Sequence, residues 1–182
     1  MAEPEDALLV ARIRVGDKEA YSVVVERYQG SIGRYLYRLV GDAALAEDLC
    51  QETFLRAYRA LSPPQGGQAD VALGPWLYRI ASNAAISALR RRRLLSFLPF
   101  VERSLGGEAL AAPNLEERDL VRRALARVPP DYAACLVLNA VEGYSYREIA
   151  EILGLSGEAV RKRIARGKAA FRKAYLALSG ED

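Results

Sequence analysis

The sequence predicts an all-α fold made of two small helical domains joined by a linker. No stretch of the 182 residues sustains the alternation of apolar and polar side chains that marks a half-buried strand. Glycines, prolines and capping residues instead divide the chain into segments of helical length. Residues 94–113 hold two prolines and a Gly–Gly pair without a helical period, so we expect the linker there, between a first domain at 1–93 and a second at 114–182.

Five helical segments are expected in the first domain. Gly16 separates the first two, Gly41 ends the third, and Asp42 has the side chain of an N-cap for the fourth. A loop is expected at 62–74, because this segment begins with Ser-Pro-Pro-Gln-Gly-Gly. The expected helices cover 5–15, 17–29, 31–40, 43–61 and 75–93.

The second domain is expected to begin with a helix at Asn114, which stands three residues before Glu117, as in a capping box. Pro129 and Pro130 end this helix and open the next, which we expect over 130–141. A glycine-bounded turn then leads into the last part of the chain.

Residues 145–173 carry the strongest local motif. Ser145 and Glu148 have the spacing of a capping box. Gly154 suits a tight turn, and Ser156 is the N-cap of a second helix. The buried face of that helix is expected at Val160, Ile164, Gly167 and Phe171. Its opposite face is polar and basic, which is typical of a helix-turn-helix whose second helix enters the DNA major groove. The alternative is a helical hairpin whose basic face meets only water.

The segment 75–93, PWLYRIASNAAISALRRRR, combines an aromatic side chain, an amide and positive charge on one stripe. The stripe repeats at three- and four-residue steps through Trp76, Arg79, Asn83, Ser87 and Arg90. A stacking surface beside cations suits the unstacked bases of a single strand. The alternative is that Trp76 only anchors the start of the helix in the core.

The helix expected at 43–61 has a different outer surface. Leu45, Leu49, Thr53 and Phe54 are expected to point inward, while the outer face holds Glu47, Asp48, Gln51, Glu52 and Arg56. An acidic face of this kind does not bind DNA. It is either solvated or a surface for docking a protein.

Composition argues against several classes of function. The only cysteines, Cys50 and Cys135, are far apart and the chain has no histidine, so no zinc site is expected. Because no catalytic or phosphate-loop motif is present either, we expect no enzymatic activity and no cofactor. No long apolar run or signal peptide is present, so we expect a cytoplasmic protein without membrane insertion. The net charge is +3, but 161–173 holds seven basic residues and no acid, which favours a nucleic-acid partner.

Four blocks in this order resemble bacterial sigma factors of the extracytoplasmic-function group of the sigma-70 family. The blocks are LLVARIRVGDKEAY, AEDLCQETFLRAYRAL, PWLYRIASNAAISALRRRR and VEGYSYREIAEILGLSGEAVRKRIARGK. The resemblance implies that 1–93 is a sigma-2 helical bundle, that 114–182 is a sigma-4 helix-turn-helix domain, and that the linker lies near the RNA exit path of the polymerase.

The resemblance also implies partners and site residues. The polymerase core would bind through its large-subunit clamp helices, and also through its flap; the clamp-helix contacts would be Glu47, Asp48, Gln51, Glu52 and Leu55. The non-template strand of the −10 element would face Trp76, Tyr78, Arg79, Asn83, Ser87, Arg90 and Arg91. The −35 duplex would face Ser156, Glu158, Ala159, Arg161, Lys162, Arg163 and Arg166. The loop 62–74 would hold an extruded base, and an anti-sigma factor is a further partner that such proteins often have.

The chain departs from the family pattern at two places. Leu73 stands where members commonly carry an aromatic residue, and Ser87 stands where many carry aspartate. The expected function is promoter-specific initiation of transcription through binding of core polymerase and of the −10 and −35 elements. Two alternatives remain: a stand-alone helix-turn-helix regulator, and a sigma mimic that occupies polymerase without starting transcription.

Overall fold

A computed structural model describes residues 4–63, 72–95 and 115–180, and within these ranges the chain forms eight helices and no strand. The predicted all-α fold class is therefore confirmed. The helices are α1 (Pro4–Arg14), α2 (Lys18–Val40), α3 (Ala43–Leu61), α4 (Leu73–Leu95), α5 (Leu115–Ala126), α6 (Pro130–Ala140), α7 (Tyr146–Leu153) and α8 (Gly157–Ser179). The predicted linker 94–113 and the predicted cap Asn114 lie almost wholly outside the described residues.

Helix α2 is one continuous helix, so the prediction of two helices at 17–29 and 31–40 is wrong. Glycine in a helix interior costs about 1 kcal/mol. Here the helix continues because its buried side chains, among them Val24, Ile32 and Tyr35, form one stripe across the glycines. A Cβ built on Gly33 would lie 3.9 Å from Cys50 Sγ, which shows how near α2 comes to α3 at this point. Burial of the stripe outweighs the local propensity.

Several helix ends agree with the prediction because the residues that cap them lie next to them in sequence. The Asp42 carboxylate accepts a hydrogen bond from the Leu45 amide at 3.1 Å, and α3 covers 43–61 as predicted. Gly41 ends α2 in the left-handed conformation, with φ of 68°. Helix α4 begins at Leu73, two residues before the expected start, so that Pro75 lies in its first turn, where a proline is tolerated.

The N-terminal unit packs α1, α3 and α4 around α2. Tyr35 of α2 is fully buried and shares a hydrogen bond of 2.6 Å with Ser82 of α4, which is also buried. The Tyr21 hydroxyl of α2 donates to the Phe54 carbonyl of α3. Leu49, Thr53 and Phe54 are buried, so three of the side chains expected to point inward from this helix do so.

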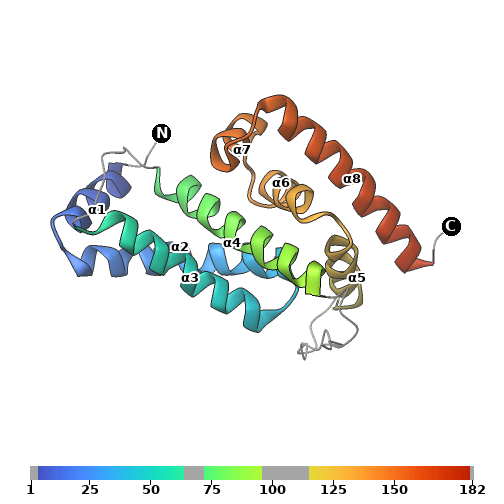
Figure 1. The fold of residues 1–182 in the computed structure, drawn as a ribbon, viewed down its shortest axis with the longest axis horizontal. Coiled ribbons are helices and arrows are strands. Elements are labelled where there is room, and N and C mark those ends of the chain that lie inside the picture. Colours follow the sequence, from blue (N-terminus) through green and yellow to red (C-terminus); the bar gives the residue numbers. More distant parts are fainter. Residues whose placement is uncertain (1–3, 64–71, 96–114, 181–182) are drawn as a thin grey trace.

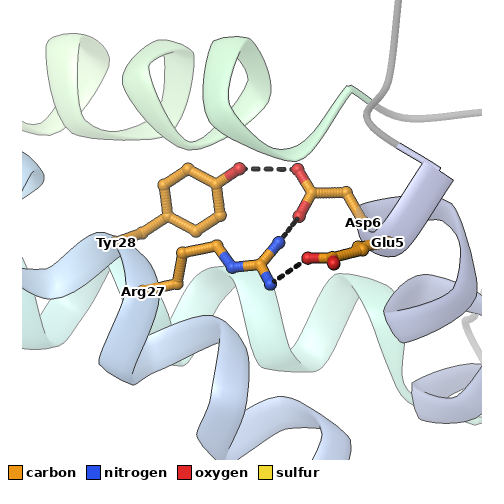
Figure 2. Close-up of polar contacts among 4 residues, drawn as sticks. All are labelled: Glu5, Asp6, Arg27 and Tyr28. Atoms are coloured by element: carbon orange, nitrogen blue, oxygen red, sulfur yellow. Dashed lines mark hydrogen bonds and ion pairs between the residues drawn. The ribbon is translucent and has the colours of Figure 1, made fainter.

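A polar cluster attaches α1 to α2 (Figure 2). Asp6 is almost fully buried, and its carboxylate accepts hydrogen bonds from the Arg27 guanidinium at 2.7 Å and from the Tyr28 hydroxyl at 2.6 Å. The second Nη of Arg27 donates to the exposed Glu5 carboxylate at 2.8 Å. A buried carboxylate is stable only when its acceptors are used, and here both oxygens are.

The C-terminal unit consists of α5 to α8, with α8 packed along α5, α6 and α7. A Cβ on Gly167 would lie 3.2 Å from the backbone oxygen of Tyr132, so glycine allows α8 to approach the start of α6. The prediction for the buried face of α8 is largely confirmed: Val160, Ile164 and Gly167 are buried, while Phe171 is partly buried.

The two units pack directly against each other. Helix α4 lies between the N-terminal helices and the pair α6 and α7 (Figure 1), and it contacts α2 and α3 as well as α6 and α7. Buried side chains from both units form one contiguous apolar cluster. Tyr78 of α4 stacks edge-on against Tyr144, which precedes α7, with ring centroids 5.4 Å apart.

Replacing Asp6 by alanine should destabilise the protein by about 1–3 kcal/mol, since the Tyr28 hydroxyl and the Arg27 guanidinium lose buried partners. Urea unfolding followed by circular dichroism measures the change. Glu5→Ala is the matched control: it removes a neighbouring carboxylate from the same arginine, but at an exposed site. Equal effects of the two substitutions would contradict the role assigned to the buried cluster.

Candidate nucleic-acid interface

The helix-turn-helix is formed by α7, the turn at Gly154 and α8. The Ser145 hydroxyl accepts a hydrogen bond from the Glu148 amide, and the Glu148 carboxylate accepts one from the Ser145 amide at 2.8 Å, so the capping box is complete. The Ser145 hydroxyl also donates to the Glu148 carboxylate at 2.6 Å, and this bond, together with the one from the Ser145 amide, holds the pKa of Glu148 below its ordinary value. Gly154 adopts φ of 64°, and the Ser156 hydroxyl accepts from the Ala159 amide at 3.1 Å. The predicted capping box, the turn and the second cap are therefore all present.

The first half of α8 presents a charged outer face. Arg161, Lys162 and Arg166 are exposed, and Glu158 forms an ion pair of 2.6 Å with Lys162 one turn later. Ser156 is exposed and Ala159 is partly so. Arg166 also donates to the Tyr132 hydroxyl of α6 at 3.4 Å. Since the buried side chains lie on the opposite side, the exposed face of the helix can offer hydrogen bonds to bases and phosphates.

Arg163 does not lie on this exposed face. It is partly buried, and its guanidinium lies 3.7 Å from Oδ1 of Asp131 on α6. The same carboxylate binds Arg90 of α4. Of the residues predicted to face the −35 duplex, Arg163 is therefore the one that lies beside the contact between the two units.

The stripe predicted on α4 is formed in part. Arg79, Asn83 and Ser87 are exposed on α4, and Trp76 is partly buried against the core. Both interpretations of Trp76 therefore keep some support, because one part of the side chain packs and another is open. On the opposite face, Leu77, Ala81 and Ala84 are buried.

Tyr78 and Arg90 are engaged with the C-terminal unit. The Tyr78 hydroxyl donates to the Glu142 carboxylate at 2.6 Å, and burial raises the pKa of this tyrosine. The Arg90 guanidinium donates to both oxygens of Asp131, at 2.8 and 2.9 Å. Arg91, next to it, is exposed.

A half-open groove runs between the two units at this point. It has a volume of about 270 Å³ and is lined from α4 by Asn83, Ile86, Ser87 and Arg90, and from the other unit by Asp131, Leu153, Leu155 and Arg163. Three residues from the predicted −10 stripe thus share one groove with the helix-turn-helix.

The outer face of α3 is accessible. Glu47, Asp48, Gln51 and Leu55 are exposed, and Glu52 is partly so because it pairs with Arg56 at 2.5 Å. Leu55 is 55% exposed. An apolar side chain within a polar rim is compatible with a protein-docking surface and also with a solvated helix face, the two alternatives left by the sequence.

Two family models together match most of the described chain. The family model for sigma-70 region 2 matches residues 24–94, and that for sigma-70 region 4 matches 118–171. The chain is 35% identical to the RNA polymerase sigma-H factor of Pseudomonas aeruginosa, covering 100% of this chain and 99% of the relative. It is 34% identical to the ECF RNA polymerase sigma-E factor of Escherichia coli, covering 91% of this chain and 92% of the relative. The chain belongs to the extracytoplasmic-function group of sigma-70 factors.

A solved structure agrees with this membership. The complex of CnrH with the cytosolic domain of CnrY contains a chain 25% identical to this sigma factor, with a TM-score of 0.69 and coverage of 98% and 99%. Region 2 corresponds to most of α2 together with α3 and α4, and region 4 to the helices from α5 into α8.

The structure of this sigma factor shows what Leu73 does at the position where family members commonly carry an aromatic residue. Leu73 is fully buried in the first turn of α4, so it serves the core and not the surface of the stripe.

Sequence reasoning missed Arg38, Asp131 and Glu142, which connect the two units. No local signal marks them, because each depends on a partner that is far away in sequence.

The described residues contain no cluster of His, Cys, Asp or Glu that could hold a metal ion. Among the described helices none is long and apolar enough to cross a membrane. Cys135 is fully buried, and burial raises the pKa of its thiol to about 11, so it stays protonated at neutral pH.

Ser145→Ala should destabilise the helix-turn-helix in a pH-dependent way. A serine cap contributes about 1 kcal/mol. The pKa of Glu148 is lower in the folded state than its ordinary value of 4.5, so its contribution is present above pH 4.5 and is lost as the pH falls through the folded value. The difference in unfolding free energy between wild type and variant should therefore shrink in acid. Ser156→Ala, a cap without a carboxylate partner, should show no such trend in the same urea titrations.

Proposed function

We propose that this chain is a promoter-specificity subunit of bacterial RNA polymerase. It binds the core enzyme through α3, reads the −35 element with α8, and contacts the melted −10 strand with α4. Catalysis belongs to the polymerase, and the chain itself is not an enzyme. The proposal includes a cytoplasmic location, where polymerase and promoter DNA are found.

The exposed basic face of α8 supports this function best. Arg161, Lys162 and Arg166 are held outward on a helix whose other face is seated by Val160 and Ile164. Arginine at this place can donate two hydrogen bonds to guanine, and neighbouring cations bind phosphates. The set of residues assigned to the −35 element stays a prediction on this basis.

The α3 face supports docking to a protein and not to DNA. Its carboxylates repel phosphate, and its exposed Leu55 gives a partner an apolar contact. The large-subunit clamp helices are the proposed partner for this face. The flap is the proposed partner for the C-terminal unit.

An anti-sigma factor is a further proposed partner. The support is the solved complex of CnrH with the cytosolic domain of CnrY, whose sigma chain aligns along nearly the full length of this one. Co-purification of the tagged chain from its own cells, followed by mass spectrometry, would identify such a protein.

Transcription with purified core polymerase is the deciding measurement. Adding this chain should produce promoter-specific transcripts from genomic templates that core polymerase alone does not give. A stand-alone regulator would bind duplex operators tightly without polymerase. A sigma mimic would bind core polymerase and yield no transcript.

Trp76→Ala should reduce melting of the −10 region by roughly tenfold, because a base that stacks on an aromatic side chain contributes about 1–3 kcal/mol. Asn83→Ala should reduce it less, by roughly fivefold, because it removes a hydrogen-bonding amide, whose net contribution is about 1 kcal/mol. Permanganate reactivity of thymines in the reconstituted open complex measures melting. Gln29→Ala, which changes an exposed amide on α2, is the control. Unchanged reactivity in both stripe variants would refute the assignment of the stripe.

Lys162→Ala should make the fall of log affinity with log salt less steep. The magnitude of the slope should decrease by about 0.9 for each phosphate that the side chain no longer neutralises. The measurement is fluorescence anisotropy of holoenzyme on a duplex −35 fragment selected from random sequence. Lys173→Ala removes the same charge from the far half of α8, beyond the predicted −35 contacts, which end at Arg166, and should leave the slope as it is. The same slope in wild type and Lys162→Ala would place the DNA elsewhere.

A further inference from the structure

Helix α1 is connected to the start of α4 through a side chain of α2. The Tyr28 hydroxyl of α2 donates to the buried Asp6 carboxylate of α1 at 2.6 Å (Figure 2). The ring of the same tyrosine packs against Gly74 in the first turn of α4. The predicted −10 surface contains none of these three residues, but it begins at Trp76, two positions after Gly74.

The approach of Tyr28 to Gly74 is close because the glycine has no side chain. Gly74 is buried, and a Cβ built on it would lie 3.4 Å from Cε1 of Tyr28 and 3.7 Å from the Tyr28 hydroxyl oxygen. The Tyr144 hydroxyl lies 3.7 Å from the same point. The tyrosine ring therefore meets the backbone of the helix directly, and its place sets how near this turn comes to α2.

Trp76 moves with this turn. Its amide donates to the Ala72 carbonyl at 3.1 Å, which closes the turn that contains Gly74. The indole is partly buried against the core, so only a part of it is open to a base. A binding side chain has to be held within about 0.5 Å of its productive position by neighbours that are themselves locked by packing and hydrogen bonds.

Asp6 locks Tyr28 in place. One carboxylate oxygen accepts from the Tyr28 hydroxyl, and the other accepts from the Arg27 guanidinium at 2.7 Å. The carboxylate cannot rotate without breaking one of these bonds, and hydrogen bonds to an ionised acceptor are the stronger ones. Because Asp6 is almost fully buried, water does not readily replace either partner.

We propose that Asp6 is a positioning residue for −10 recognition. Through Tyr28 it sets the first turn of α4, and thereby the orientation of Trp76 toward the melted strand. This inference rests on the proposed function of α4. An Asp6 that only attached α1 would change the stability of the chain when replaced. A positioning Asp6 also changes the surroundings of the indole, and strand binding, in chains that remain folded.

Asp6→Asn and Tyr28→Phe test the proposal, since each removes a part of the contact and keeps the shape of the side chain. Trp76 is the only tryptophan, so the fluorescence of the folded chain reports its surroundings. In both variants the emission maximum should shift to the red and acrylamide should quench the emission more strongly, because the loosened turn admits water to the indole.

Strand binding is the second measurement. The probe is a fluorescein-labelled single-stranded oligodeoxynucleotide with the −10 non-template sequence of a promoter that the wild-type holoenzyme transcribes. Holoenzyme containing either variant should bind it roughly fivefold more weakly, because a part of the stacking on Trp76 is lost. The affinity of each variant for core polymerase should match that of wild type.

Tyr21→Phe is the matched control. It removes a tyrosine hydroxyl from the same helix, but the lost bond goes to the Phe54 carbonyl of α3 and not to α1. Its emission and strand binding should equal those of wild type. Gly74→Ala approaches the contact from the other side, because the added Cβ presses on the Tyr28 ring while Asp6 is unchanged. It should reproduce the red shift and the weaker strand binding, and it carries the test with Tyr28→Phe if Asp6→Asn unfolds.

The proposal is overturned if Asp6→Asn and Tyr28→Phe leave the emission of Trp76 unchanged, or weaken strand binding no more than Tyr21→Phe does. Failure of the wild-type holoenzyme to transcribe would instead remove the proposed function. The emission of the free chain would then still report whether Asp6 positions the start of α4.

Discussion

Burial of helix α4 between the two units is the constraint on which the arrangement depends. On one side Ser82 shares a hydrogen bond with Tyr35 of α2. On the other, Tyr78 donates to Glu142 and meets the ring of Tyr144. Tyr78 and Ser82 are one turn apart, and the Ser82 hydroxyl donates to the Tyr78 carbonyl at 2.6 Å. One short stretch of helix therefore connects both cores, which explains why the apolar cluster is continuous.

The outer faces of α3 and α8 carry charge of opposite sign. The outer face of α3 is acidic around Leu55, whereas the outer face of α8 is basic. Like charges disfavour DNA on the first face, and opposite charges favour it on the second. The same principle operates inside the chain, since Asp131 and Glu142 satisfy cations and hydroxyls of α4 in the absence of nucleic acid. The modest net charge of +3 is thus the sum of surfaces with opposite charge.

Local features were predictable because their determinants lie within one helical turn. The capping box at Ser145, the turn at Gly154 and the cap at Asp42 each need residues no more than four positions apart. The continuity of α2 was not predictable in this way. Glycine propensity argues for a break at Gly30, and only the packing of Ile32 and Tyr35 against other helices overrides it. The early start of α4 has a similar origin, because Leu73 is fully buried.

The sequence by itself determined the fold class, most helix ends, the helix-turn-helix and the family, since periodicity, caps and ordered motifs are written in neighbouring residues. Only the tertiary structure decided that Tyr78, Arg90 and Arg163 meet acids of α6 and its C-terminal end. Those contacts join Arg90 to Asp131 and Tyr78 to Glu142, pairs separated by 41 and 64 positions. Their existence depends on how two helical units pack, which is governed by the shape and polarity of whole surfaces and not by any local pattern.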